Sequence, residues 1–309
     1  MIKLKTFGGF MAGNAITSVQ EGTWRSEKLE KLFVYLAMNR NRGVCIEDIS
    51  EAIWQLDEDT GNPVGALKNL AYRLRKALRD ASFDEECIVS VRGGLYKWNN
   101  DVEVTVDVEE FDGYINEAEL AFSRSKETAI ECYEKAIALY NGDFLPHRTD
   151  THWFMTLNAF YHSRYVNTVK ALAKLYIDTG RYEKLEQLCT RAIVYERSDE
   201  QIYSYLIVAR MRTKKVQMAF DTYETAKTIM DNELGVRKTV MLNKVYEELL
   251  SVTKGVSSYN IDEVKEDINE ESMEGVFMCG YPVFKEIYHL EVRKSARSNV
   301  PESLVLITV

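Results

Sequence analysis

The 309-residue sequence lacks the features of membrane-spanning, secreted and common catalytic proteins. Its longest apolar runs are far too short to cross a bilayer. The N-terminal MIKLKTFGGFMAG has no sustained apolar region that would indicate a signal peptide. The signatures GxxxxGKS, GxxxxGKT, GxGxxG, GxSxG and HExxH are also absent, which argues against common NTPases, dinucleotide enzymes, hydrolases and metalloproteases. We therefore expect that the protein is not an enzyme.

Cysteine is sparse and scattered. The five cysteines are odd in number and show no CxxC or Cys/His ligand spacing. This pattern is typical of isolated buried thiols in a reducing cytoplasm. His147 and His152 flank Asp150, but their spacing matches no zinc motif, and a loop-to-helix junction is the simpler interpretation. We expect a cytoplasmic protein with no metal and no cofactor.

Basic residues are fewer than acidic residues, and the charge is unevenly distributed along the chain. The chain has 39 Lys and Arg against 48 Asp and Glu, a formal net charge of -9. Residues 1–100 are nearly neutral, with 14 basic and 13 acidic residues, whereas the remaining residues hold 25 and 35. This balance argues against indiscriminate coating of nucleic acid but is compatible with one local basic surface.

The first hundred residues predict a small mixed domain. Alternation in MIKLKTFGGF indicates a strand that turns at Gly8 and Gly9. Ser26 offers an N-cap to the helical pattern EKLEKLFVYLAMN, and IEDISEAIW fits a second, shorter helix. Asn62 and Pro63 begin a third helix, because Asn caps well and Pro suits the first helical position. The runs CIVSV and LYKWN then predict a β-hairpin.

The third helix, residues 62–79, contains five basic residues and not one acid. At about 100° per residue one side is apolar and the other carries Lys, Asn, Tyr and Arg. Lys and Arg neutralise phosphates, and Asn pairs with adenine in the major groove, so a DNA-reading helix needs this mixture. The alternative is a solvated basic face, which is common on helices. The order of two helices followed by a hairpin favours a winged helix-turn-helix. The apolar side is formed by Leu67, Leu70, Ala71, Leu74, Ala77 and Leu78.

From about residue 106 the sequence is nearly all helical in pattern, and an internal repeat is visible. Leu172, Tyr176, Gly180, Tyr182 and Ala192 are followed 34 residues later by a matching set. Thirty-four residues is the period of tetratricopeptide helix pairs, so we expect an all-α repeat domain. The matching set is Leu206, Arg210, Lys214, Val216 and Ala226.

The C-terminal part predicts a linker and a small fragment. Residues 254–274 are polar and rich in acid, whereas 275–309 indicate strand, helix and strand. This βαβ-like piece weakly resembles the opening half of a ferredoxin-like cyclase palm. The chain stops on an apolar strand, before the carboxylates such a domain needs for magnesium, so we expect a piece to be missing and assign no catalysis.

Several motifs together resemble a known family. The segments EKLEKLFVYLAMNRNRGVCIEDISEAIW, ALKNLAYRLRKAL and IVSVRGGLYKW resemble an OmpR-type winged helix. AIALYNGDFLP, Trp153, the repeat helices and YETAKTIMDNELGV resemble the bacterial transcriptional activator domain. Over residues 1–250 the chain is similar to the antibiotic-regulatory-protein class of bacterial activators. The fold expected is mainly α with small β: a winged helix at 1–103, tetratricopeptide-like helices at 104–253, a linker at 254–274 and the fragment 275–309.

The resemblance implies a sequence-specific transcriptional regulator of the activator type that binds double-stranded promoter DNA. Arg75 would hold a phosphate or the domain itself, and Arg92 would serve the wing. The acidic loop before the recognition helix would contact RNA polymerase or be merely solvated; it holds Asp57, Glu58 and Asp59. The remaining DNA contacts implied are Lys68, Asn69, Tyr72, Arg73, Lys76 and Arg79.

Two other functions stay open from the sequence. One is a helical-repeat scaffold whose winged helix binds protein instead of DNA. The other is the regulatory part of a truncated nucleotide enzyme. In the regulator interpretation, the helical domain receives a peptide, protein or small-molecule signal, and homodimers on repeated half-sites fit the geometry of such regulators. No membrane partner is expected.

Overall fold

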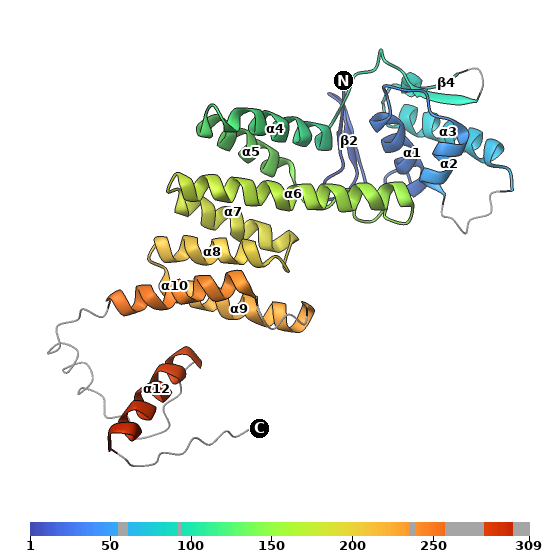
Figure 1. Cartoon of the computed structure of the whole chain (residues 1–309). Coiled ribbons are helices and arrows are strands. Elements are labelled where there is room, and N and C mark those ends of the chain that lie inside the picture. The colour runs from blue at the N-terminus through green and yellow to red at the C-terminus, as the bar shows by residue number, and fades with distance from the viewer. Residues whose placement is uncertain (55–60, 92–93, 235–238, 257–280, 299–309) are drawn as a thin grey trace. The chain divides into compact units, whose positions relative to one another are not determined.

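The computed structural model describes residues 1–54, 61–91, 94–234, 239–256 and 281–298 (Figure 1). The chain divides into two units, Met1–Lys254 and Gly255–Val309. The predicted polymerase loop, Arg92 and the predicted strands 275–279 and 303–309 lie outside the described residues. None of the described helices is long and apolar enough to cross a membrane.

A four-stranded sheet opens the first unit, in the order β3-β2-β1-β6. Its strands are β1 (Ile2–Lys5), β2 (Met11–Gly13), β3 (Ser18–Gln20) and β6 (Val104–Val106). β1 alternates buried and exposed side chains as its sequence predicts, and the chain turns through Gly8 and Gly9 at φ +80° and +141°. β6 pairs in parallel with β1, so the strand that follows the predicted boundary at residue 103 joins the N-terminal sheet.

In the described residues of the N-terminal part, three helices and a hairpin accompany this sheet. They are α1 (Glu27–Met38), α2 (Ile46–Ile53), α3 (Pro63–Asp80), β4 (Ile88–Val91) and β5 (Leu95–Trp98). The three helices pack on one another, and the hairpin contacts α1. They enclose an aromatic core in which the ring centroids of Phe33 and Trp98 lie 5.5 Å apart. A short 3₁₀ turn, η1 (Glu85–Cys87), connects α3 to β4. The winged-helix arrangement expected from the sequence is confirmed.

Between residues 107 and 256 the described part of the chain forms seven helices, and each packs mainly against its neighbours in the chain (Figure 1). α6 is 27 residues long, and its first turns reach α2. The helices are α4 (Asp107–Phe122), α5 (Lys126–Leu139), α6 (His152–Asp178), α7 (Tyr182–Tyr195), α8 (Glu200–Arg212), α9 (Val216–Leu234) and α10 (Val240–Val256).

The 34-residue repeat is visible in the backbone. Gly180 follows α6 at φ +69°, and Lys214 follows α8 at φ +61°, so both repeats use a left-handed residue at the same place. The preceding residues also match, because the hydroxyls of Thr179 and Thr213 donate to Leu175 and Ala209 carbonyls four residues earlier. The tetratricopeptide-like helix pairs predicted from this period are therefore confirmed.

In the second unit the structure describes one helix, α12 (Tyr281–Ser298), which covers the segment predicted to be helical. The linker expected at 254–274 begins inside α10, which continues to Val256. Its remaining residues lie outside the described part of the chain.

Candidate nucleic-acid interface

α3 is fixed in place from its first residue. The side chain of Asn62 accepts a hydrogen bond from the Gly65 N–H at 2.9 Å, and Pro63 follows it. This satisfies one of the backbone donors that a helix start leaves unpaired. Four leucines then anchor the helix in the core, so its opposite face must turn outward. The anchoring residues are Leu67, Leu70, Leu74 and Leu78, with Ala71 beside them.

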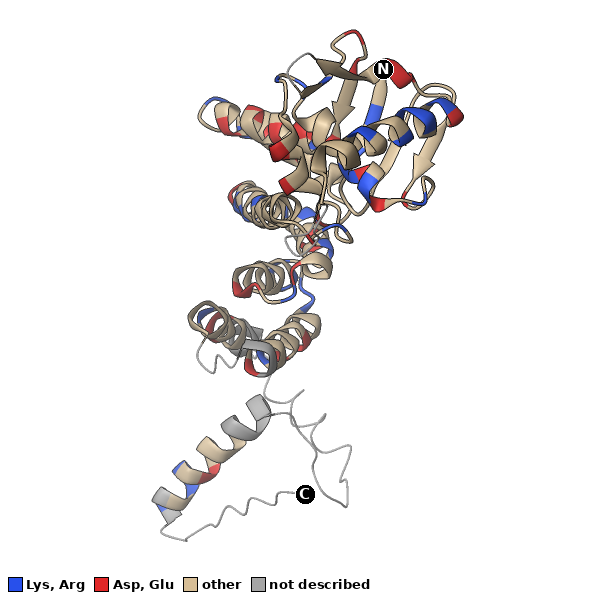
Figure 2. Ribbon diagram, turned by 90° about the vertical axis from the view of Figure 1, so that its right-hand side faces the viewer, with Lys and Arg blue, Asp and Glu red and all other residues tan. Residues whose placement is uncertain are grey.

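The outward face of α3 is basic and polar, as its sequence predicts. Figure 2 looks onto this side of the N-terminal domain, where Lys and Arg recur along one long helix. Tyr72 is 67% exposed among them. Five exposed side chains of this face form no hydrogen bond or ion pair with any residue the structure describes: Lys68, Asn69, Tyr72, Arg73 and Lys76. We call these five residues the basic face.

Two of the predicted DNA-contacting arginines have partners within the protein. Arg75 donates through Nε and Nη2 to the Ile88 carbonyl, at 3.1 and 3.0 Å. The sequence left two roles open for Arg75, a phosphate contact or an anchor within the domain itself. The structure supplies a partner for the second role, because Arg75 ties α3 to β4, the first strand of the hairpin. Arg79 donates to the Glu85 carboxylate, with Nε at 2.8 Å, but remains largely exposed.

The hairpin lies beside α3 with one face turned in and one turned out. Tyr96 and Trp98 are buried, whereas Val89, Val91 and Leu95 are exposed. Gly94 takes φ +80° in the turn, a conformation that favours glycine. The described part of the wing therefore offers apolar side chains, and its predicted basic residue, Arg92, lies outside the described residues.

Sequence reasoning missed a group of ion pairs that hold the winged-helix part against the helices. Glu30 accepts from Arg148 Nη2 at 2.7 Å, and the two side chains are only 2% and 6% exposed. Lys31, 1% exposed, forms an ion pair with Asp150. The two partners of each pair lie more than 100 positions apart in the sequence. Glu30 and Lys31 also look like ordinary surface residues in a helical sequence. No local signal could have paired them.

Further contacts complete this junction. Arg40 binds Glu109 through two bonds of 2.6 Å each. The Asp107 carboxylate accepts from the backbone N–H groups of Thr6 and Phe7 at 2.8 to 3.0 Å. Burial raises the pKa of Asp107, although these hydrogen bonds favour its charged form and oppose that rise. The sheet that supports the winged helix is therefore bonded to the first residue of the helical domain.

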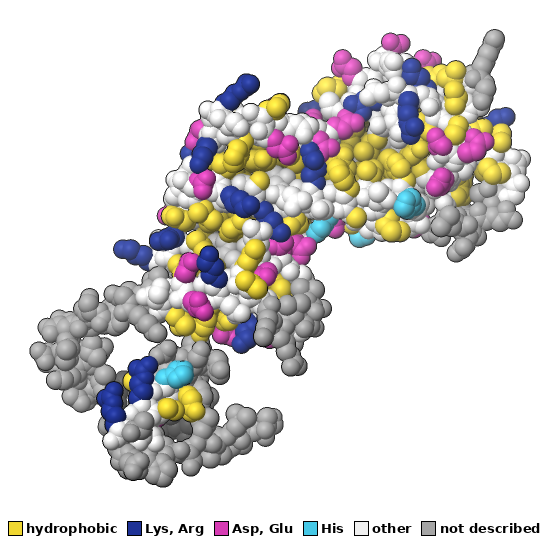
Figure 3. Space-filling view, viewed as in Figure 1, with side chains coloured by type: hydrophobic (Ala, Val, Ile, Leu, Met, Phe, Trp, Pro, Cys, Tyr) yellow, Lys and Arg dark blue, Asp and Glu magenta, His cyan; other side chains and the backbone are white. Residues whose placement is uncertain are grey.

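The charge pattern differs on the helical domain. On the face of α4 to α10 that Figure 3 shows, basic and acidic side chains are interspersed with hydrophobic ones. Several charged residues of the helical domain are paired, for example Lys184 with Glu134 at 2.7 Å and Lys215 with Glu186 at 2.7 Å. The basic face of α3 contrasts with this pattern, because its cations have no acid beside them within residues 62–79.

Comparison with known proteins agrees with this architecture. Residues 106–250 match the model of the bacterial transcriptional activator domain. The chain is 24% identical over 258 residues to Transcriptional regulator RedD of Streptomyces coelicolor, covering 80% of this chain and 73% of that protein. The structure of Mycobacterium tuberculosis EmbR in complex with a low affinity phosphopeptide superposes with a TM-score of 0.62 at 20% identity.

The match to EmbR covers 81% of this chain, and the chain spans 65% of the length of that solved protein. At this identity the likeness shows the fold, from the N-terminal sheet through the helical repeats. The family model and the curated relative concern transcription regulation. Residues 106–250 of the chain therefore carry a bacterial transcriptional activator domain, and the chain is similar over 80% of its length to a transcriptional regulator.

Proposed function

We propose that this regulator binds double-stranded promoter DNA by inserting α3 into the major groove, with the basic face toward the bases and phosphates. The observation that carries the proposal is the exposure of Lys68, Arg73 and Lys76 on a helix with no competing acid partner among the described residues. Cations held ready in this way release counterions from the phosphates and give salt-dependent affinity.

Individual roles follow from side-chain chemistry. Asn69 has an amide that can pair with the N6 and N7 edge of adenine, whereas Lys76 near the helix end suits a phosphate. Arg75 serves by positioning α3 against Ile88, because its guanidinium is already bonded there. Arg79 donates to Glu85 through both Nε and Nη2, but its side chain is exposed enough to exchange this partner for a phosphate.

Two further contacts belong to the proposal by resemblance. Arg92 at the wing would reach the DNA backbone, and the acidic loop with Asp57, Glu58 and Asp59 would face a basic surface of RNA polymerase. Such contacts fit an activator acting in the cytoplasm. As part of the same proposal, residues 1–103 would bind DNA and the helical part predicted at 104–253 would receive the signal, with β6 (Val104–Val106) joining the N-terminal sheet.

The proposal is tested with the intact protein. Genome-wide DNA capture first identifies bound sites, and anisotropy titrations at several salt concentrations then compare variants on one captured duplex. Lys76→Ala should weaken binding to all duplexes and reduce the salt slope by about one, whereas Asn69→Ala should relax preference at particular bases by about 1–3 kcal/mol. Lys174→Ala removes an exposed cation from α6 and is the matched control.

Unchanged affinity and base preference in both Lys76→Ala and Asn69→Ala would refute the assignment of α3. Retention of a protein partner together with absence of any DNA site would instead favour the scaffold function.

A further inference from the structure

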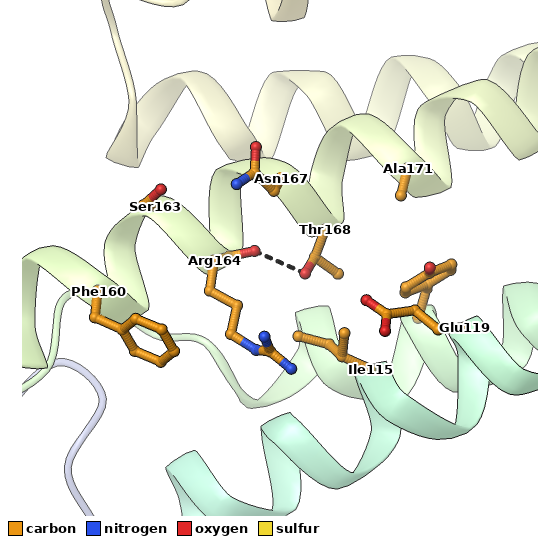
Figure 4. A pocket seen from close by; sticks show the side chains of 9 residues that line it. Ile115, Glu119, Phe160, Ser163, Arg164, Asn167, Thr168 and Ala171 are labelled. Carbon is orange, nitrogen blue, oxygen red and sulfur yellow. Dashed lines mark hydrogen bonds between the residues drawn. The ribbon is translucent and has the colours of Figure 1, made fainter.

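A groove of about 280 Å³ lies between α4 and α6, away from the basic face of α3 (Figure 4). α4 contributes one apolar and one acidic side chain, α5 contributes a tyrosine, and α6 contributes the opposite wall. The residues that carry the argument are Ile115, Glu119, Tyr133, Phe160, Arg164 and Asn167.

The groove carries one uncompensated negative charge. Figure 4 shows that Glu119 and Arg164 extend into it from opposite sides. Arg164 is already neutralised, because its Nε lies 2.6 Å from Asp112 Oδ1 and its Nη2 donates to Asn116 at 3.2 Å. Glu119 is exposed and has no hydrogen bond or ion pair with any residue in the described ranges. The groove therefore favours a cation.

A hydroxyl lies near this charge. Tyr133 is 5% exposed, and its pKa is raised by burial and by the charge of Glu119, so its hydroxyl stays protonated at neutral pH. A phenol oxygen has lone pairs that can accept from an incoming ammonium or guanidinium. Glu119 and Tyr133 thus form two acceptors from two different helices.

The rest of the groove suits a long, partly apolar side chain on a peptide backbone. Ile115, Ala171 and the half-exposed Phe160 offer apolar surface for methylene groups. Ser163 and Asn167, one helical turn apart on α6, are exposed and have no bonding partner within the described chain. An Asn amide can donate to and accept from one peptide group.

We infer that this groove receives a single Lys or Arg side chain from an extended segment of a protein partner. The cationic head would lie at Glu119 and Tyr133, the methylenes against Ile115, and the adjoining peptide group at Asn167. A volume of about 280 Å³ fits one such side chain. Pockets for cofactors and drug-sized ligands are larger, roughly 300–1,000 Å³. The acidic excess of residues 101–309 would steer a basic segment toward it. This inference goes beyond DNA binding and does not depend on it.

The test uses the full chain with ¹³C-labelled Ile and Thr methyl groups, whose Ile115 and Thr168 signals report on the groove. Three probes are titrated: Nα-acetyl-lysine N-methylamide, its norleucine analogue without the charge, and n-butylamine without the peptide group. We expect saturable shifts with the lysine probe and binding about tenfold weaker for norleucine, because a charge-assisted bond is lost. Butylamine should also bind more weakly, because it cannot bond to Asn167.

Two isosteric variants separate the groove from general acidity. Glu119→Gln should weaken lysine-probe binding about tenfold, whereas Glu110→Gln, on the same helix but outside the groove, should not. Unchanged methyl signals elsewhere show that each variant is folded. Absence of saturable shifts, equal binding of norleucine, or full binding by Glu119→Gln would each overturn the inference. Equal binding of butylamine would assign the groove to free amines and overturn the protein partner.

Discussion

Arg148 donates to Glu30 across 2.7 Å, and this bond joins the segment before α6 to the first helix of the DNA-binding part. Both side chains are buried, and Glu30 also accepts from the Gly22 N–H at 2.7 Å. Glu21 and Glu27 lie 3.0 and 3.3 Å from the same guanidinium. One arginine therefore satisfies three carboxylates at the junction, and its removal leaves a buried negative charge.

We expect Arg148→Met to lower the free energy of unfolding by about 3 kcal/mol, since removing one partner of a buried pair leaves the other uncompensated. Denaturant unfolding at neutral pH measures the loss. The control is Lys126→Ala, whose pair with Asp178 is half exposed on both sides and should cost less than about 1 kcal/mol. Equal losses in the two variants would contradict a structural role for the buried pair.

His162 gives a second prediction, on pH. Its Nδ1 lies 2.8 Å from Asp143 and its Nε2 lies 3.1 Å from Glu196. The hydrogen bond to Asp143, followed by that to Glu196, raises the pKa of His162 to about 9. The folded protein thus holds this proton more tightly than the unfolded chain, whose histidine titrates near 6.5.

The sign follows from that difference. The contribution of protonated His162 is fully present below about pH 6.5 and is lost as pH rises through about 9. The free energy of unfolding of the native protein should therefore fall between pH 7 and 10. We expect His162→Gln to reduce this fall by up to about 3 kcal/mol. Urea titrations of both proteins across this range measure the difference. Parallel pH profiles would refute the role of His162.

Local patterns predicted the elements that local physics determines. The apolar stripe of α3, the cap at Asn62 and the 34-residue period each depend on neighbours within one or two helices, and all are present. β2, β3 and β6 were not predicted, because three-residue strands are too short to show alternation and form only by pairing with β1 or with each other.

The candidate site divides in the same way. Periodicity correctly placed Lys68 and Asn69 outward, because that follows from the buried leucines alone. It could not choose a partner for Arg75, since the Ile88 carbonyl comes close only when the hairpin packs beside α3. The pairing of Glu30 with Arg148 depends on the same long-range packing.

The start of α3 supplies a third prediction. A Cβ at position 65 would lie 2.8 Å from Nδ2 and 3.1 Å from Cγ of Asn62, so glycine makes room for the capping side chain. Asn62→Ala should cost about 1 kcal/mol by loss of the cap. Gly65→Ala should cost stability in the native background, yet gain up to about 1 kcal/mol in the Asn62→Ala background, where alanine's helix propensity is unopposed.

Unfolding of the four proteins of this double-mutant cycle gives the coupling energy between positions 62 and 65. Simple additivity of the two substitutions would show that the cap does not need the glycine.

Lys214 gives the fourth prediction. It has φ +61°, where side chains other than glycine are strained, and Gly180 occupies the equivalent position one repeat earlier at φ +69°. The Lys214 side chain is exposed and has no bonded partner among the described residues. Lys214→Gly should therefore raise the free energy of unfolding by about 0.5–1 kcal/mol, because relief of the strain exceeds the added entropy of the unfolded chain. Lys214→Ala keeps the Cβ and is the control: it should not stabilise, and an equal gain in both variants would show that the charge, rather than the backbone conformation, is the cause.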